Sequence, residues 1–352
     1  MRMVPRFDPI DLFSLCRFGS ILPRTESDWP PAAEAGDLAH AVRAAVEAGG
    51  ADALAYSGGI DSTVIGRFAP GARRFTLDTG AAGVEVDEPT TVIRAPSTML
   101  ETPIDVVAAA LGEPTHSAAP FGFWPLFRAI VDAGGKTVMT GDGADELFGG
   151  HAYYLDPAVA GAVDDWAGYR RVRALEAAIV PESLFGDSLL ASARAQPWEA
   201  SDRARQVWAA AEQHTGVERL RFVDVALRMH HQCVRLQGNL CRAAGLGYVA
   251  PYVDRTVVAV ALSEPLEPTQ PKRALKRLSP THPHGKEPMY TPMSGGLPAR
   301  WRELLSTETT RRHGLFRPAA VEALIGALDP AAEYLPRAVM VVATAHALMA
   351  TT

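Results

Sequence analysis

Apolar residues recur with a helical period near the start of the chain and then give way to short runs of strand length. Leu38, Val42 and Val46 share one helical face after Asp37, whose carboxylate suits an N-cap, and Gly49-Gly50 end the pattern. This spacing predicts a helix that begins directly after residue 37.

Four apolar runs of strand length occupy residues 52–56, 73–78, 90–95 and 136–140. Helical patterns cover residues 63–68 and 121–135 between them. Because strands alternate with helices over residues 37–150, we predict an α/β fold built on a parallel sheet, with ligands at the carboxyl ends of its strands.

Strand patterns fade after residue 150, and helical spacing continues in residues 164–180, 198–214, 217–243 and 334–350. Residues 262–298 are rich in proline, glycine and basic side chains. We expect a long loop over a site there, because connections beyond about 12–15 residues are usually functional or disordered. The expected regions are an N-terminal arm (1–36), an α/β core (37–160) and a mainly α-helical region (161–352) that completes the substrate site.

Composition narrows the class of protein. The 352 residues, 47% hydrophobic and 21% charged, suffice for about two globular domains. With 34 basic and 40 acidic residues the formal charge is −6, so we expect no binding to nucleic acid or to an anionic membrane.

The N-terminus lacks the apolar core of a signal peptide, and no run reaches about 18 apolar residues, so a cytoplasmic location is expected. Cys16, Cys233 and Cys241 are too few and too irregularly spaced for a disulfide framework or a Cys-x-x-Cys metal site.

Lysine is rare among the basic residues. The chain has only Lys136, Lys272, Lys276 and Lys286, and three of these lie within residues 272–286. A compact ammonium approaches a phosphate as a point charge, which a planar guanidinium does not reproduce. The cluster favours an anion-binding role for this segment, with chance clustering as the alternative.

The first motif with chemistry is SGGIDS, which lies between a predicted strand and a predicted helix. Gly58 and Gly59 let the backbone approach a ligand closely, and the start of the helix offers N–H groups to a polyanion. Ser57 and Ser62 can donate from their hydroxyls, and Asp61 can hold Mg²⁺ against phosphates. No Lys-Ser/Thr pair follows the glycines, so the loop differs from a Walker A loop. An ordinary capped glycine turn is the alternative.

The second motif is GDGADELFGG, residues 141–150, which follows the strand predicted at 136–140. Asp142, Asp145 and Glu146 lie within five residues and repel one another unless a cation or a donor is present. Such a turn suits Mg²⁺ that bridges phosphates, with an acidic helix cap as the alternative.

This second string resembles the signature of the asparagine synthetase family, which includes the β-lactam synthetases and the lasso-peptide cyclases. SGGIDS likewise resembles the pyrophosphate loop of enzymes that split ATP into AMP and pyrophosphate. The resemblance extends over about residues 37–305. It implies a sheet of the ATP-pyrophosphatase (adenine nucleotide α-hydrolase-like) type, ATP and Mg²⁺ as cofactors, and amide formation through an acyl-adenylate.

The resemblance also implies roles for individual residues. By match, Asp61 and Asp145 would bind Mg²⁺, and ATP would be bound by Ser57, Gly58, Gly59, Asp61, Ser62, Gly141 and Lys272. Lys272 begins KRALK, which is similar to the family's Lys-x-x-Leu-Arg. Asp142 stands where members carry an acid, or in β-lactam synthetases a tyrosine, near the reacting carbonyl. Lys286 in GKEPMYTP matches a lysine that neutralises charge at the reaction centre, with a solvated lysine as the alternative. Asp142 and Lys286 are therefore the catalytic candidates, as proton acceptor and oxyanion partner.

Three departures from the family's pattern bear on the substrate. Residue 2 is Arg2, where the glutamine-dependent members have a catalytic cysteine, so we expect no glutaminase domain. The family's Glu-x-Arg-x-Pro-Phe-Leu-Asp is replaced by Gly247 to Asp254 (GYVAPYVD), which keeps the proline and the aspartate but lacks the Glu and the Arg. Aspartate is therefore in doubt as the substrate. His151 replaces a tyrosine that often follows the two glycines, with no role assigned from the sequence.

The expected enzyme takes a small-molecule or peptide carboxylate and ammonia or an amine. A partner protein that supplies substrate or ammonia, and a homodimer, stay open. His230 and His231 are candidate bases, but a helix-surface pair is the more ordinary interpretation. The alternatives to a synthetase are a tRNA-modifying ATP pyrophosphatase, which the charge of −6 and the acidic turn oppose, and a non-catalytic nucleotide-binding homologue.

Overall fold

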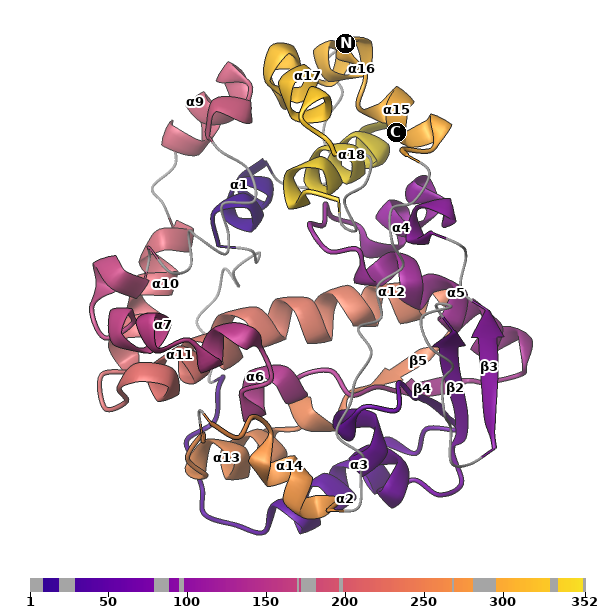
Figure 1. The fold of residues 1–352 in the computed structure, drawn as a ribbon, viewed down its shortest axis with the longest axis vertical. Coiled ribbons are helices and arrows are strands. Elements are labelled where there is room, and N and C mark those ends of the chain that lie inside the picture. The colour runs from indigo at the N-terminus through magenta and orange to yellow at the C-terminus, as the bar shows by residue number, and fades with distance from the viewer. Residues whose placement is uncertain are drawn as a thin grey trace.

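The computed structural model has a five-stranded sheet with helices on both faces, which lies at the right-hand side of the molecule in Figure 1. The structure describes residues 9–18, 29–78, 89–94, 98–169, 171, 182–195, 199–267, 269–280, 296–329 and 335–350. The strands are β1 (Ala53–Ala55), β2 (Arg73–Asp78), β3 (Thr90–Arg94), β4 (Thr137–Met139) and β5 (Gly247–Val249).

All neighbouring strands are parallel, in the order β3-β2-β1-β4-β5. The prediction of a parallel α/β sheet is confirmed. β5 was not expected, because three residues are too few to show the alternation of a strand. Its pairing with β4, in which Gly247 lies opposite Thr137, creates it.

The strand order has one reversal, which lies between β1 and β4. From β1 the chain adds β2 and β3 on one side, whereas β4 and β5 extend the sheet on the other. In open α/β sheets, ligands bind in the crevice at the carboxyl ends of the strands where the order reverses. SGGIDS follows β1 and GDGADELFGG follows β4, so this topology brings both motifs to that crevice.

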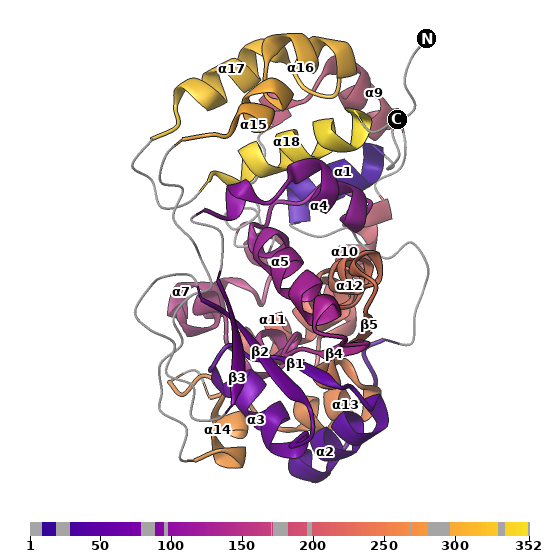
Figure 2. The same ribbon diagram turned by 90° about the vertical axis from the view of Figure 1, so that its right-hand side faces the viewer.

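Two layers of helices cover the sheet (Figure 2). On one face lie α2 (Leu38–Gly49), α3 (Ile60–Phe68) and α13 (Arg255–Ser263), and on the other lie α4 (Ile104–Leu111), α5 (Ala119–Asp132) and α12 (Gln237–Ala244). Val42, Leu54 and Val258 belong to the first core, and Phe127 and Leu240 to the second. The predicted N-cap of α2 is confirmed, since Asp37 accepts hydrogen bonds from two backbone N–H groups of the first turn.

The helix predicted at residues 217–243 is present, but its centre has a different geometry. It comprises α11 (Gly216–Asp224), a π-helical segment (η4, Val225–Leu236) and α12 (Gln237–Ala244), which follow one another without a break. π-helical segments are rare and occur frequently at functional sites. Hydrophobic periodicity does not distinguish this wider winding from an α-helix, so it was not expected.

The remaining helices form a side lobe and an end lobe. The side lobe contains α7 (Pro157–Ala162) and α10 (Glu199–Ala210), which pack with α11. The end lobe contains α15 (Ala299–Leu304), α16 (Thr307–His313), α17 (Pro318–Gly326) and α18 (Arg337–Ala350), and α18 packs on α4 (Figure 2). The described residues also form these short helical elements: α6 (Ala144–Phe148), α9 (Asp187–Ala195), η1 (Met99–Glu101), η2 (Ala152–Leu155), η3 (Glu182–Leu184) and η5 (Pro251–Val253).

Helices expected at 198–214 and 334–350 are confirmed by α10 and α18. Most of the stretch 164–180 lies outside the described residues. Within the segment expected to be a loop, α14 (Arg273–Leu278) is a helix, so the expectation was wrong there; its six residues are too few for a periodic signal, and Leu275 anchors it in the core. The N-terminal arm contains α1 (Pro9–Phe18), whose Leu12 and Leu15 are buried. Among the described helices, none is long and apolar enough to span a membrane.

Candidate active site

The loop after β1 is a tight turn held by its own serines. Gly58 has a φ of 70°, a conformation that glycine adopts without strain. Ser62 Oγ accepts from Ser57 N at 3.2 Å and donates to the Gly59 carbonyl at 3.1 Å. Ser57 Oγ accepts from Gly59 N at 3.3 Å. The turn thus closes around the start of α3, where no side chain caps the first N–H groups. These N–H groups can bind an anion.

Asp61 lies in the first turn of α3 and is 7% exposed. Tyr252, from the segment after β5, donates to the Asp61 carbonyl at 2.8 Å and fixes this turn against the second motif. Gly141 has no room for a side chain, because an added Cβ would lie 3.0 Å from Asp61 Cβ. The two motifs are therefore in van der Waals contact, as the strand order requires.

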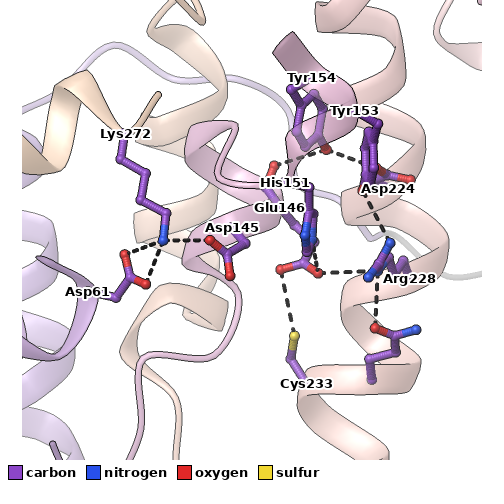
Figure 3. Close-up of polar contacts among 11 residues, drawn as sticks. Asp61, Asp145, Glu146, His151, Tyr153, Tyr154, Asp224, Arg228, Cys233 and Lys272 are labelled. Carbon is purple, nitrogen blue, oxygen red and sulfur yellow. Dashed lines mark hydrogen bonds and ion pairs between the residues drawn. The ribbon is translucent and has the colours of Figure 1, made fainter. Parts of the chain in front are cut away.

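Lys272 joins the two predicted metal ligands (Figure 3). Its Nζ lies 2.6 and 2.8 Å from the two oxygens of Asp61 and 2.5 Å from Asp145 Oδ1. The lysine side chain is only 11% exposed. The two carboxylates raise its pKa against the opposing effect of burial. Asp61 and Asp145 thus converge on a position that holds a positive charge.

The donor set at this position fits magnesium. Two carboxylates face one point, and Mg²⁺ is usually bound by one or two carboxylates together with substrate phosphates and water. No cluster of three or more His, Cys, Asp or Glu side chains that could hold a metal occurs in the part of the chain that the structure describes. An ion there would need the phosphates of ATP to complete its coordination.

Asp142 faces the same crevice and has other partners. Its Oδ2 accepts from Thr140 Oγ1 at 2.6 Å and from the Tyr248 hydroxyl at 2.9 Å. Withdrawal from water raises the pKa of Asp142, although these two hydrogen bonds lower it. A carboxylate with a raised pKa is a stronger proton acceptor. Tyr248 was missed in the sequence, where it is 106 residues from Asp142.

Glu146, the third acid of the turn, points away from Lys272 (Figure 3). It is 4% exposed and lies 3.0 Å from His151 Nε2 and 3.4 Å from Arg228 Nε. Burial opposes its charge, but His151 and Arg228 lower its pKa. His151 stacks on Tyr153 with ring centroids 5.1 Å apart. The role of His151, which the sequence left unassigned, is thus to hold Glu146 as an anion.

The three acids take separate partners, which offset their mutual repulsion. Asp142 bonds to hydroxyls, Asp145 to Lys272, and Glu146 to His151 and Arg228. Asp145 and Asp61 share the Lys272 ammonium.

A cavity of about 870 Å³ connects these groups. At one end lie the loop after β1, the acidic turn and Lys272. The opposite wall is largely apolar and comes from α1, α5 and η4, with Leu15, Phe123, Leu126 and Leu236 among its residues. The size suits a ligand larger than a metabolite of a few atoms, since small-molecule sites span about 300–1,000 Å³.

The histidine pair differs from the surface pair that the sequence favoured. His230 is exposed, but His231 is 1% exposed and lines the cavity. His231 Nε2 pairs with Glu113, which also pairs with Arg235. His231 therefore lies on the inner face of η4. The contact with Glu113 spans 118 residues, so no local pattern could reveal it.

Three further positions that the sequence singled out are Lys286, Gly247 and Asp254. Lys286 lies outside the described residues. Packing explains why residue 247 is a glycine, because a Cβ there would lie 2.7 Å from Thr137 Oγ1 on β4. Asp254, which the family pattern shares, caps α13 by accepting from Thr256 N at 2.8 Å.

The asparagine synthase family model matches residues 35–350 of the chain. The comparison of the chain with curated proteins found no match.

Proposed function

This chain belongs to the asparagine synthase family, and from that premise we propose that it is an AMP-forming carbon–nitrogen ligase. In general terms, members are ATP-dependent amide-forming synthetases. The finer assignment is that the enzyme adenylates a carboxylate, releases pyrophosphate and transfers the acyl group to ammonia or an amine. The observation that carries it is the convergence of Asp61 and Asp145, from the two motifs, on one cation position.

The chain's own residues suit the adenylation step. The N–H groups at the start of α3 and the Ser57 and Ser62 hydroxyls would bind the departing pyrophosphate. Asp61 and Asp145 would hold Mg²⁺, which when bound neutralises the charge that gathers on the phosphates. The ammonium of Lys272 contacts Asp145, so it would add a further positive charge beside the phosphate oxygens that Mg²⁺ neutralises.

Acyl transfer needs a proton acceptor beside the attacking nitrogen. Asp142 suits this role, since it lines the cavity and has a raised pKa. Tyr248 and Thr140 orient its carboxylate. We assign to Lys286 the stabilisation of the developing oxyanion, on the family match alone. The acyl group would occupy the apolar wall, with a small-molecule or peptide acid of specialised metabolism as the substrate class.

The test is the product of ATP cleavage. Incubation with ATP, Mg²⁺ and a panel of carboxylic acids should release AMP and pyrophosphate with at least one acid. Asp61→Asn and Asp145→Asn should each lower this release by about 10²-fold or more, because each removes a charge that the departing group needs. Lys136→Gln is the matched control, because Lys136 is exposed and lies directly before β4, at the opposite end of the strand from the acidic turn.

Two results would contradict the proposal: ADP and phosphate as products, or parental rates in both variants. Nucleotide binding without turnover on any acid would favour the non-catalytic homologue. Release that depends on tRNA would favour the tRNA-modifying alternative.

A further inference from the structure

The ammonium of Lys272 uses its full donor capacity on the two acids. It has three N–H groups, and the structure gives it three short contacts: two to Asp61 and one to Asp145. The group thus occupies the point at which both carboxylates would meet Mg²⁺.

The chain is built to place this ammonium. Lys272 has a φ of 58° and is the one non-glycine residue with a positive φ in the described part of the chain. Side chains rarely adopt this conformation, so the surroundings must enforce it. One restraint is the hydrogen bond from Lys272 N to the Phe148 carbonyl at 2.8 Å, which ties the residue to the end of α6.

Gly150 supplies the second restraint. A Cβ at this position would lie 2.0 Å from Asp145 Oδ1 and 2.3 Å from Lys272 Cε. The side chains of Lys272 and Asp145 therefore meet directly over a glycine backbone. The last glycine of the GDGADELFGG motif thus gives the ion pair its space.

The charges do not balance at this position. Two carboxylates carry −2 and the ammonium carries +1, so these three groups together carry one net negative charge in a site where Asp61 is 7% exposed. A divalent ion would match the acids better, but it must first displace the ammonium. Free Mg²⁺ gives up its water reluctantly, and among the described residues two carboxylates face it here.

We propose that Lys272 is a resident counter-ion that closes the magnesium position to free metal and yields it only when the metal arrives with a nucleotide. The phosphates add ligands for the metal and give the displaced ammonium a new anionic partner. The flexible four-carbon stem of lysine allows this exchange, whereas a wide guanidinium would not fit over Gly150. The inference rests on the proposed function only through the metal-binding role of Asp61 and Asp145.

The direct test is Mn²⁺ binding measured by electron paramagnetic resonance, with and without α,β-methylene-ATP. In the parent, the analogue should tighten Mn²⁺ binding about tenfold or more, a usual size for coupling between two ligands. In Lys272→Gln, Mn²⁺ should bind about tenfold tighter than in the parent when no nucleotide is present. Lys136→Gln, which removes an exposed lysine, should behave as the parent does.

Thermal unfolding provides a second measurement. Without metal, Lys272→Gln removes the cation shared by two facing carboxylates and should lower the Tm. Addition of Mg²⁺ alone should restore it. The parent Tm should not respond to Mg²⁺ alone at the same concentration. The double variant Lys272→Gln/Asp145→Asn should lose the response to Mg²⁺.

Tight Mn²⁺ binding to the parent without nucleotide would overturn the inference, even if no Lys272 variant folds. So would a Lys272→Gln protein whose affinity for free Mn²⁺ equals that of the parent. If either Mn²⁺ result is found while ATP cleavage still depends on Asp61 and Asp145, only this inference fails and the proposed function survives. If both aspartate variants keep full activity, the proposed function fails.

Discussion

At the residue scale, Asp142 and its two hydroxyl partners form the part of the site best suited to proton transfer. Burial raises the pKa of Asp142, and the bonds from Thr140 and Tyr248 lower it. Because a base acts in its unprotonated form, amide formation should be lost as the pH falls through this raised pKa. Tyr248 is thus a positioning residue that also sets the working pH range.

The prediction is that Tyr248→Phe shifts the acidic limb of kcat/KM for amide formation to higher pH, since one pKa-lowering bond is removed. Asp142→Asn should lower the rate of amide formation by about 10²–10⁴, the usual range for a general base. Single-turnover rates of adenylate and amide formation, measured across pH, separate the two steps. Tyr154→Phe, which removes a hydroxyl bonded to Asp224 and to the Glu146 carbonyl but not to Asp142, is the control. An unchanged acidic limb in Tyr248→Phe would exclude this role.

Glu146 gives a second residue-scale prediction, which concerns stability. Its pKa is lowered in the folded protein, because His151 and Arg228 outweigh the effect of burial. The stabilisation is therefore present above its ordinary pKa and is lost as the pH falls through the lowered value.

His151→Phe should reduce the free energy of unfolding at pH 7 by about 1–3 kcal/mol, since a buried carboxylate loses a partner. This difference from the parent should shrink in acid, once Glu146 is protonated. Urea unfolding at pH 7 and below pH 4 measures both values. His214→Phe, outside this network, controls for the loss of an imidazole. A difference under about 0.5 kcal/mol at pH 7 would contradict the assignment.

At the scale of elements, the aspartate that closes GYVAPYVD has a structural explanation. Asp254 is exposed and accepts from Thr256 N and Val257 N at the start of α13, which packs on α2. We therefore expect Asp254→Ala to lower the free energy of unfolding by about 1 kcal/mol, as for other N-caps, with KM for ATP unchanged. Chemical denaturation with steady-state kinetics tests both. A large change in KM at full stability would show that Asp254 acts in the site instead.

The π-helical segment is the element that the site depends on most beyond the two motifs. It places His231 and Leu236 on the cavity wall and the Cys233 carbonyl next to the Tyr248 hydroxyl. Arg228 on the same segment reaches Glu146. One irregular helix thus supports both the cavity wall and the acidic turn.

At the scale of the whole molecule, the thiols bear on the source of nitrogen. All three cysteines are buried, and burial raises the pKa of each thiol. A glutaminase that uses cysteine needs a reactive thiolate. We predict that this chain releases no glutamate from glutamine, while ammonia or an amine supports amide formation. Glutamate release by the purified chain would contradict this prediction. Release that persists in Cys233→Ser would show that Cys233 is not the nucleophile.

The two motifs illustrate how much of the site local sequence can determine. Glycines and acids next to short apolar runs predicted the loop after β1, the turn after β4 and the parallel sheet, because backbone conformation and strand periodicity are local properties. The contact of Asp61 with Gly141 then followed from the strand order. The asparagine synthetase-like character was also evident from these strings, and the match over residues 35–350 confirms it.

Only the tertiary structure decided which side chains meet. The partners Lys272 and Asp61, Tyr248 and Asp142, and His231 and Glu113 are separated by 211, 106 and 118 residues. Short elements such as β5 and α14 exist because β5 pairs with β4 and Leu275 of α14 packs in the core, so their own residues carry too weak a signal. Residues of one type therefore took different roles: Lys272 became a counter-ion and His231 became buried, while Lys136 and His230 stayed exposed. Sequence determines the local backbone and the available chemistry, whereas packing over long separations selects the partners.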